Sequence, residues 1–179
     1  MPARLTSVIL KQANEIKDKN ERVNWLRENA TYAVRGLLNF NFHKEVKFLL
    51  PEGQPDLEGL AVKKETEDFV LGTEFSHLNH EMKKMYLFYE GGHPDLKQMK
   101  REQLWVTLIT GLHSDERDDI SLMKDHKLEE KYPNVTQEVG HLAFPELVPK
   151  PTPIKELVRD NKGRFAKKTK KTKKKEPKK

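Results

Sequence analysis

Residues 75–112 read FSHLNHEMKKMYLFYEGGHPDLKQMKREQLWVTLITGL and predict two helices joined by a sharp turn. In the first half, apolar residues recur every one to four positions, as on one face of an amphipathic helix: Phe75, Leu78, Met82, Met85, Tyr86 and Tyr89. The glycines and proline of residues 91–94 end this helix. Asp95 and Gln98 match a capping box, which opens a second helix that runs to about Leu112. We therefore expect a central antiparallel pair of helices.

The first 50 residues repeat the same helical spacing and predict three further short helices. The first covers Leu5 to Ile16. Asp18 and Glu21 form a capping-box pattern at the start of the second, and Thr31 can cap the third. Tight turns are expected to join these three helices.

Two more helices are predicted after the central pair. Ser114 can cap a helix that runs to about Lys127, and Thr136 opens a short one that ends near Phe144, before a proline. We find neither an alternating strand pattern of useful length nor an internal repeat. The predicted fold is mainly α, a compact bundle of about six to seven short helices.

Composition shifts divide the chain into five segments. Residues 1–50 and 73–144 carry the helical patterns and are expected to form one domain. Residues 51–72 are a connecting loop, and residues 145–160 are a proline-rich connector. Residues 161–179 are a lysine-rich tail that we expect to be disordered.

The overall composition narrows the function classes. The 179 residues are 35% charged and 35% apolar and include no cysteine, which removes disulfides, thiolate nucleophiles and cysteine-ligated metals. The apolar run near the N-terminus has only three residues, too few for a signal peptide or a spanning helix. We expect an intracellular protein with no membrane partner and no cofactor.

Charge is distributed very unevenly along the chain. Residues 161–179 hold eleven of the 34 basic residues and one of the 28 acidic residues, a net charge of about +10. The 23 basic and 27 acidic residues of segment 1–160 leave that part at about −4. This separation predicts an acidic body with a cationic tail.

Nonspecific binding to the phosphates of DNA or RNA is the favoured interpretation of the tail. The predicted contacts are Lys162, Arg164, Lys167, Lys168, Lys170, Lys171, Lys173, Lys174 and Lys175. A narrower alternative places the Lys-Gly-Arg sequence of residues 162–164 along a minor groove. A second alternative is a solubilising tail whose charge is incidental or contacts the acidic body.

Several unusual strings carry a family resemblance. They are WLREN at 25–29, FLLPEG at 48–53, YLFYEGGHPDL at 86–96, KRE at 100–102, GLHSDE at 111–116 and KDHKL at 124–128. Together they resemble an uncharacterised family of small proteins from T4-like phages, especially cyanophages, over roughly residues 5 to 144. The resemblance implies a phage-encoded protein of unassigned function in the cytoplasm of an infected bacterial host, with the virion as an alternative location. The tail lies outside it.

Two clusters could bind metal ions, but the sequence favours other interpretations. His77 and His80 share a helical face near Glu74 and Glu81, yet their order is not that of zinc metalloproteases and no third ligand is evident. We interpret the two histidines, together with Asn79 between them, as part of a solvated helix face. Four acids could hold Mg²⁺, although a helix N-terminus prefers the same residues: Asp115, Glu116, Asp118 and Asp119. We predict no metal site.

Two nucleic-acid motifs were also considered for the body. Helices 95–112 and 114–127 could form a helix-turn-helix, but the second carries the four acids and Asp125, which would repel phosphates. A base-stacking platform could draw on Trp25, Trp105, Tyr86, Phe88 and Tyr89. All of these except Phe88 lie on or next to apolar stripes, which favours core packing.

The combined hypothesis is a non-enzymatic phage accessory protein. Its acidic helical module would bind a host or phage protein, such as transcription or replication machinery, while the tail holds it on nucleic acid. One alternative is a structural or assembly component of the phage particle. Another is a metal-dependent nuclease built on the acids of residues 115–119.

Overall fold

The computed structural model describes residues 4–60 and 75–151. The predicted tail and most of the proline-rich connector lie outside these residues, as does part of the predicted 51–72 loop. Among the described residues the chain forms eight α-helical segments and one 3₁₀ helix. The only strand-type pairing there is an isolated bridge between Phe48 and Tyr89. The predicted mainly α fold is confirmed.

The three N-terminal helices match their predicted positions closely. They are α1 (Thr6–Glu15), α2 (Lys19–Asn29) and α3 (Tyr32–Phe42). The Asp18 carboxylate accepts a hydrogen bond from the amide of Glu21 at 2.9 Å, and the Thr31 hydroxyl accepts one from Val34 at 3.3 Å. Both predicted N-caps are confirmed. Such caps can be predicted from sequence because the capping side chain and the amide that it satisfies are close neighbours along the chain.

The predicted helix from Phe75 to Tyr89 is wrong in its type and extent. Helix α4 covers only Leu78–Glu81 and continues as the 3₁₀ helix η1 (Met82–Leu87). With about three residues per turn, a 3₁₀ helix aligns positions three apart. Met82, Met85 and Phe88 are accordingly all buried, while Tyr86 is 46% exposed. Because of the change of helix type, Phe88 is buried and Tyr86 is exposed, which is the reverse of the prediction.

Helix α5 (Gln98–Thr110) begins later than predicted, and its expected capping box is absent. Lys97 is the N-cap and makes no side-chain cap, while the Gln98 amide donates to the carbonyl of Leu49 at 2.9 Å. The turn before α5 requires glycine at position 92, where a Cβ would lie 2.0 Å from the Tyr86 carbonyl oxygen. A long-range contact thus replaces the local cap.

The C-terminal part contains α6 (Ser114–Lys124), α7 (Leu128–Lys131) and α8 (Gln137–Ala143). Ser114 is not the cap of α6; His113 is, and its ring Nδ1 accepts from the amide of Asp115 at 3.3 Å. Helix α6 ends three residues before the predicted Lys127, ahead of His126 with its positive φ of 57°. Helix α7 was not predicted, whereas the Thr136 cap of α8 is confirmed.

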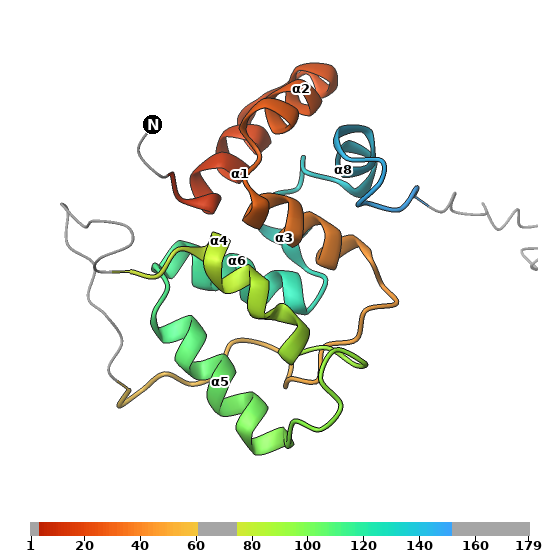
Figure 1. Cartoon of the computed structure of the whole chain (residues 1–179). Helices are drawn as coiled ribbons and strands as arrows, with labels where there is room; N and C mark the ends of the chain where they lie inside the picture. Colours follow the sequence, from red (N-terminus) through yellow and green to blue (C-terminus); the bar gives the residue numbers. More distant parts are fainter. Residues whose placement is uncertain (1–3, 61–74, 152–179) are drawn as a thin grey trace, which may run out of the picture.

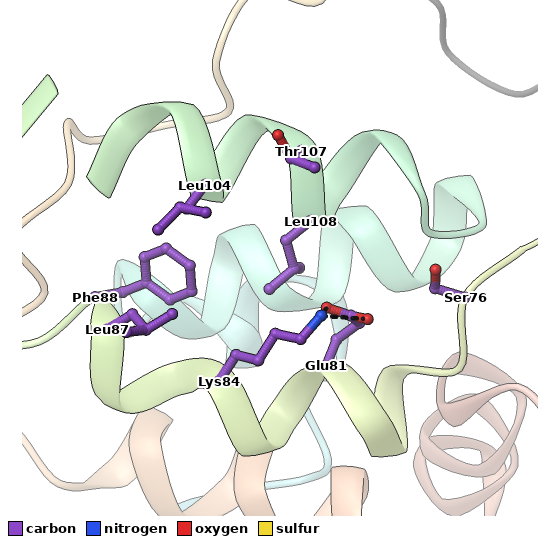
Figure 2. Close-up of a pocket in the computed structure, with 8 residues that line it drawn as sticks. All are labelled: Ser76, Glu81, Lys84, Leu87, Phe88, Leu104, Thr107 and Leu108. Carbon is purple, nitrogen blue, oxygen red and sulfur yellow. Dashed lines mark hydrogen bonds and ion pairs between the residues drawn. The ribbon is translucent and has the colours of Figure 1, made fainter. Parts of the chain in front are cut away.

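Helix α3 is the centre of the fold (Figure 1). It packs against α1, α4, η1, α6 and α8, and its residues Ala33, Val34, Leu37 and Leu38 are fully buried. Helices η1 and α5 do run antiparallel, but α5 lies at the edge of the molecule, opposite α2 and α8 (Figures 1 and 2). The predicted hairpin is therefore peripheral rather than central. No helix in the described part of the chain is long and apolar enough to cross a membrane.

Candidate functional site

All nine predicted phosphate-binding residues belong to residues 161–179, outside the part of the chain that the structure describes. Their binding role therefore stays a prediction. The sites described below lie in the acidic body.

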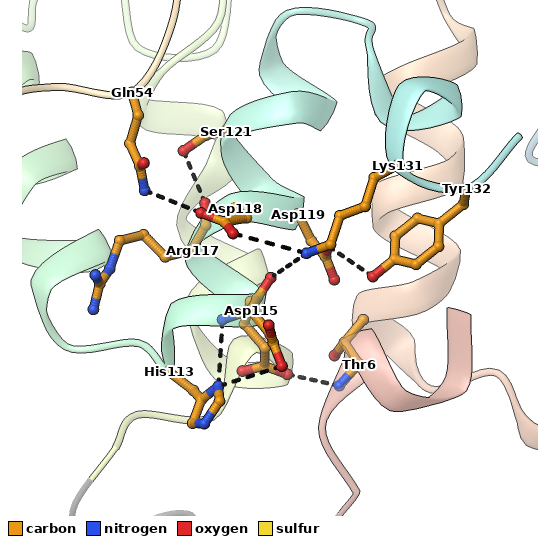
Figure 3. Close-up of polar contacts among 11 residues, drawn as sticks. Thr6, Gln54, His113, Asp115, Arg117, Asp118, Asp119, Ser121, Lys131 and Tyr132 are labelled. Carbon is orange, nitrogen blue, oxygen red and sulfur yellow. Dashed lines mark hydrogen bonds and ion pairs between the residues drawn. The ribbon is translucent and has the colours of Figure 1, made fainter. Parts of the chain in front are cut away.

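Helix α6 divides its four clustered acids between its inner and outer sides. Figure 3 labels Asp115, Asp118 and Asp119. Glu116 and Asp119 are 1% and 0% exposed, and their spacing of three residues places both on one helical face. The side chains of Asp115 and Asp118 are 56% and 51% exposed. The preference of a helix N-terminus for acids explains the outer pair, but the inner pair belongs to the core.

Asp119 connects α6 to the segment around α7. Its Oδ1 accepts a hydrogen bond from the Tyr132 hydroxyl at 2.9 Å and forms an ion pair with Lys131 Nζ at 2.8 Å. Its Oδ2 is buried and has no hydrogen-bond partner among the described residues. Burial raises the pKa of Asp119 to about 6, although both partners oppose this change. Burial and the nearby Asp119 carboxylate also raise the pKa of Tyr132.

Glu116 connects α6 to the beginning of α1. Its Oε1 accepts a hydrogen bond from the amide of Thr6 at 2.7 Å, across 110 positions of sequence. This contact satisfies one of the free amides at the N-terminus of α1. Oε2 is buried without a partner in the described part of the molecule. Burial raises the pKa of Glu116, whereas the Thr6 hydrogen bond and electrostatic interactions with His113 and His77 lower it.

The two buried carboxyl groups therefore join three parts of the fold and respond to pH. Burial is the main cause of both raised pKa values, and the negative charge of Glu116 also raises the pKa of Asp119. Nowhere in residues 4–60 and 75–151 do three His, Asp or Glu side chains gather in an arrangement that could hold a metal ion. The predicted Mg²⁺ alternative thus finds no ligand set at α6 in the structure.

The two histidines at α4 contact each other, and neighbouring side chains make polar contacts within the fold. The rings of His77 and His80 lie edge to face with centroids 5.7 Å apart. Asn79, expected on a solvated face, accepts from the amide of Ala33 at 2.8 Å and so fixes α4 against α3. Glu81 forms an ion pair with Lys84 at 2.7 Å. The interpretation as a purely solvated face is therefore wrong for Asn79.

A small cavity of about 210 Å³ lies between η1 and α5 (Figure 2). Leu104 and Leu108 of α5 face Phe88 and the ion-paired Lys84 across it. Phe88 also packs edge to face on Trp105 at 5.1 Å. Core packing is thus confirmed for Trp105, and Phe88, which the prediction left outside the core, is buried as well.

A comparison of the sequence with known families gives a match. The model of a family of unknown function, DUF6433, matches residues 9–130. The chain belongs to this family. No match was found among the curated proteins or among the solved structures. The predicted membership in an uncharacterised family is confirmed, while a phage origin stays a prediction.

In this DUF6433 member all six strings lie within the matched residues 9–130, and two of these strings contact each other directly. In the KDHKL string, Lys124 Nζ donates to the Pro51 carbonyl at 2.7 Å. Asp125 accepts from the amide of Gly53 at 2.8 Å, and Lys127 forms an ion pair with Glu52. The KDHKL string therefore holds the FLLPEG string in place.

Two other strings of the DUF6433 chain interlock in the same region. Arg101, from the KRE string, is buried and donates to the Leu87 carbonyl at 2.9 Å. The Phe88 carbonyl accepts from the amide of Leu49 at 2.7 Å. These strings are thus parts of one interlocked structure. No recognised motif in the sequence indicated these contacts.

Proposed function

We propose that this DUF6433 member is a non-enzymatic accessory protein of a T4-like phage that acts by binding. Its acidic helical body contacts a protein of the host or the phage, such as transcription or replication machinery. Its basic tail contacts DNA or RNA. The observation that carries the proposal is the separation of about +10 on residues 161–179 from about −4 on residues 1–160.

The exposed charges of the body support attachment to nucleic acid through the tail rather than direct binding of a duplex by the body. Acidic side chains that are more than half exposed occur at Glu52, Asp115, Asp118 and Glu138, in several different parts of the fold. Such charges repel the phosphates of a duplex, whereas the tail attracts them. Attachment through the tail leaves the acidic surface available to a protein partner.

The tail is tested by removing its charge from the full-length chain. The nine predicted contacts are changed to Gln: Lys162, Arg164, Lys167, Lys168, Lys170, Lys171, Lys173, Lys174 and Lys175. Fluorescence anisotropy measures binding to a random-sequence duplex between 50 and 200 mM salt. For about six to eight phosphate contacts, the slope of log K against log salt is about −5 to −7. The neutralised variant is expected to lose most of this slope.

Removal of four positive charges from the body is the control for the location of the charge. Changing the exposed residues Lys11, Lys17, Lys97 and Lys100 to Gln lowers the total positive charge but leaves the tail intact. The control should keep the slope of the unmodified chain. Equal slopes for the unmodified and tail-neutralised chains would remove the tether from the proposal.

The partner and the location need a separate experiment. An affinity pull-down from infected cells, with and without nuclease, separates protein contacts from those bridged by nucleic acid. We expect a partner that persists after nuclease treatment. Mass spectrometry of purified virions tests location: absence from virions agrees with a role in the host cytoplasm, whereas abundance there favours the structural or assembly role.

A further inference from the structure

A groove of about 450 Å³ lies between α3 and η1, two elements that pack side by side. Helix α3 contributes Tyr32, Arg35 and Phe40 to its lining, positions that share one helical face. The other wall includes Lys83 and Tyr86. Its volume falls within the range of roughly 300–1,000 Å³ that is usual for small-ligand sites.

Aromatic rings from both walls reach the solvent at this groove. Tyr32 is 58% exposed and Tyr86 is 46% exposed. The Tyr86 ring stacks on His93, with an interplanar angle of 26° and centroids 6.4 Å apart, so one of its faces is already supported. Phe40 and Tyr89 are half-buried and pack against each other at 5.8 Å. The groove therefore has an aromatic lining with two accessible rings.

The charge of the groove is opposite to that of the body around it. Its lining includes Arg35 and Lys83 but neither Asp nor Glu, although residues 1–160 carry about −4. Within the described part of the chain, neither cation forms an ion pair with a carboxylate. The Arg35 guanidinium lies over the Phe144 ring at 5.2 Å, which orients it. Both cations are thus available to an anionic ligand.

Gly36 allows the two walls to approach each other. A Cβ at this position would lie 2.7 Å from Met82 Cγ and 2.8 Å from its sulfur. Glycine therefore lets the Met82 side chain lie directly against the α3 backbone, and both residues line the groove. The shape of the groove thus depends on the packing of α3 against η1.

We propose that this groove binds a single-stranded segment of DNA or RNA. Tyr32 and Tyr86 stack on unpaired bases, while Arg35 and Lys83 contact the adjacent phosphates. Exposed aromatic rings beside cations are what single strands require, because only unpaired bases can leave their own stack and offer a free face. The proposal rests on the nucleic-acid binding proposed above and adds a preference for single strands that the tail alone does not supply.

The test compares a fluorescent 12-nucleotide oligo-dT with a 12-base-pair duplex, using the full-length chain. The double variant Tyr32→Ala/Tyr86→Ala removes both rings, and Tyr32→Phe/Tyr86→Phe keeps them. Loss of stacking for one base typically weakens single-strand binding by about fivefold or more. We expect such a loss for the alanine variant and little change for the phenylalanine variant. Duplex affinity should change by less than about twofold in both.

A charge variant tests the phosphate contact independently. Lys83→Gln should reduce the salt slope for oligo-dT by about 0.7, the value for one contact on a single strand. Lys97→Gln, at another exposed position, is the matched control and should leave that slope unchanged. Circular dichroism melting of every variant verifies that the fold is retained.

The outcomes for the groove and for the tail are distinguishable. If the alanine and phenylalanine variants bind oligo-dT equally, or if alanine weakens duplex and single strand alike, the groove proposal is overturned. The groove proposal is also overturned if a protein binds at the groove and oligo-dT does not displace it. The comparison is repeated with the tail-neutralised chain so that the two proposals are tested separately. Unchanged duplex binding by that chain contradicts the tether, whereas the groove proposal depends only on the difference between the alanine and phenylalanine variants in oligo-dT binding.

Discussion

The hydroxyl of Tyr132 donates a hydrogen bond to the buried carboxylate of Asp119 at 2.9 Å. This contact joins the residue after α7 to the inner face of α6, and Lys131 supplies an ion pair to the same oxygen. The second carboxylate oxygen has no partner among the described residues. Ionised Asp119 is therefore only partly compensated, which makes it the clearest pH-sensitive group of the body.

Asp119→Asn is predicted to remove a pH dependence of stability. The pKa of Asp119 is about 6 in the folded chain and 3.8 in the absence of structure. A raised pKa means that the folded state binds the proton more tightly, so this contribution is complete below about pH 4 and is lost as the pH rises through about 6. The shift corresponds to about 3 kcal/mol. Urea unfolding between pH 4 and pH 7 should show a difference of this order between the unmodified chain and Asp119→Asn.

Asp118→Asn is the matched control for this prediction. Asp118 lies on the same helix, but its side chain is 51% exposed. The pH dependence of this variant should follow that of the unmodified chain. An Asp119→Asn profile parallel to both would mean that the buried carboxylate does not control stability.

The helices could be predicted where their signals were local. The caps at Asp18 and Thr31 each satisfy an amide three residues away, and the structure contains both. The start of α5 could not be predicted in this way, because Gln98 donates to Leu49, a residue 49 positions distant. The 3₁₀ geometry of η1 likewise depends on burying Met82, Met85 and Phe88 against other elements. Tertiary contacts determined these departures from the helical pattern.

The candidate sites were harder to predict than the helices. The acids of α6 fit the local preference of a helix N-terminus, and nothing in their spacing distinguishes the buried Glu116 from the exposed Asp115. The groove was obscured in a similar way, since Tyr86 falls on an apolar stripe if the segment is read as an α-helix. Its exposure follows only from the 3₁₀ turn.

Gly92→Ala is predicted to destabilise the fold severely. The added Cβ would lie 2.0 Å from the Tyr86 carbonyl oxygen, and backbone atoms cannot move aside as a flexible side chain can. We expect a loss of at least about 3 kcal/mol in unfolding free energy, measured by urea denaturation. At the neighbouring Gly91 nothing lies within 4 Å of a Cβ, but φ is +84°. Gly91→Ala should therefore cost only about 1–2 kcal/mol, and equal losses would contradict the proposed clash.

Divalent cations are predicted to leave the body unchanged. Helix α6 buries Glu116 and Asp119 but exposes Asp115 and Asp118, so the four carboxylates do not converge on one ion. Millimolar Mg²⁺ or Mn²⁺ should shift the melting temperature by less than about 1 °C, because a ligand stabilises a fold only through specific binding to it. DNA and RNA incubated with the protein and either ion should stay intact. Divalent-dependent cleavage that Asp118→Ala abolishes would instead support the nuclease alternative.

The side chain of Lys124 is 1% exposed, forms an ion pair with Asp125 and donates a hydrogen bond to the Pro51 carbonyl. Asp125→Ala leaves this ammonium buried without its carboxylate, at a typical cost of about 3–5 kcal/mol. The double variant Lys124→Met/Asp125→Ala removes the charge as well and should recover part of that loss, although the Pro51 carbonyl then lacks its donor. Lys127→Ala, which breaks the exposed pair with Glu52, should cost less than about 1 kcal/mol.

Urea denaturation ranks the three variants by stability. Amide hydrogen exchange at Gly53 reports the local effect, because Asp125 accepts from that amide. A double variant less stable than Asp125→Ala would show that Lys124 stabilises the loop mainly through Pro51.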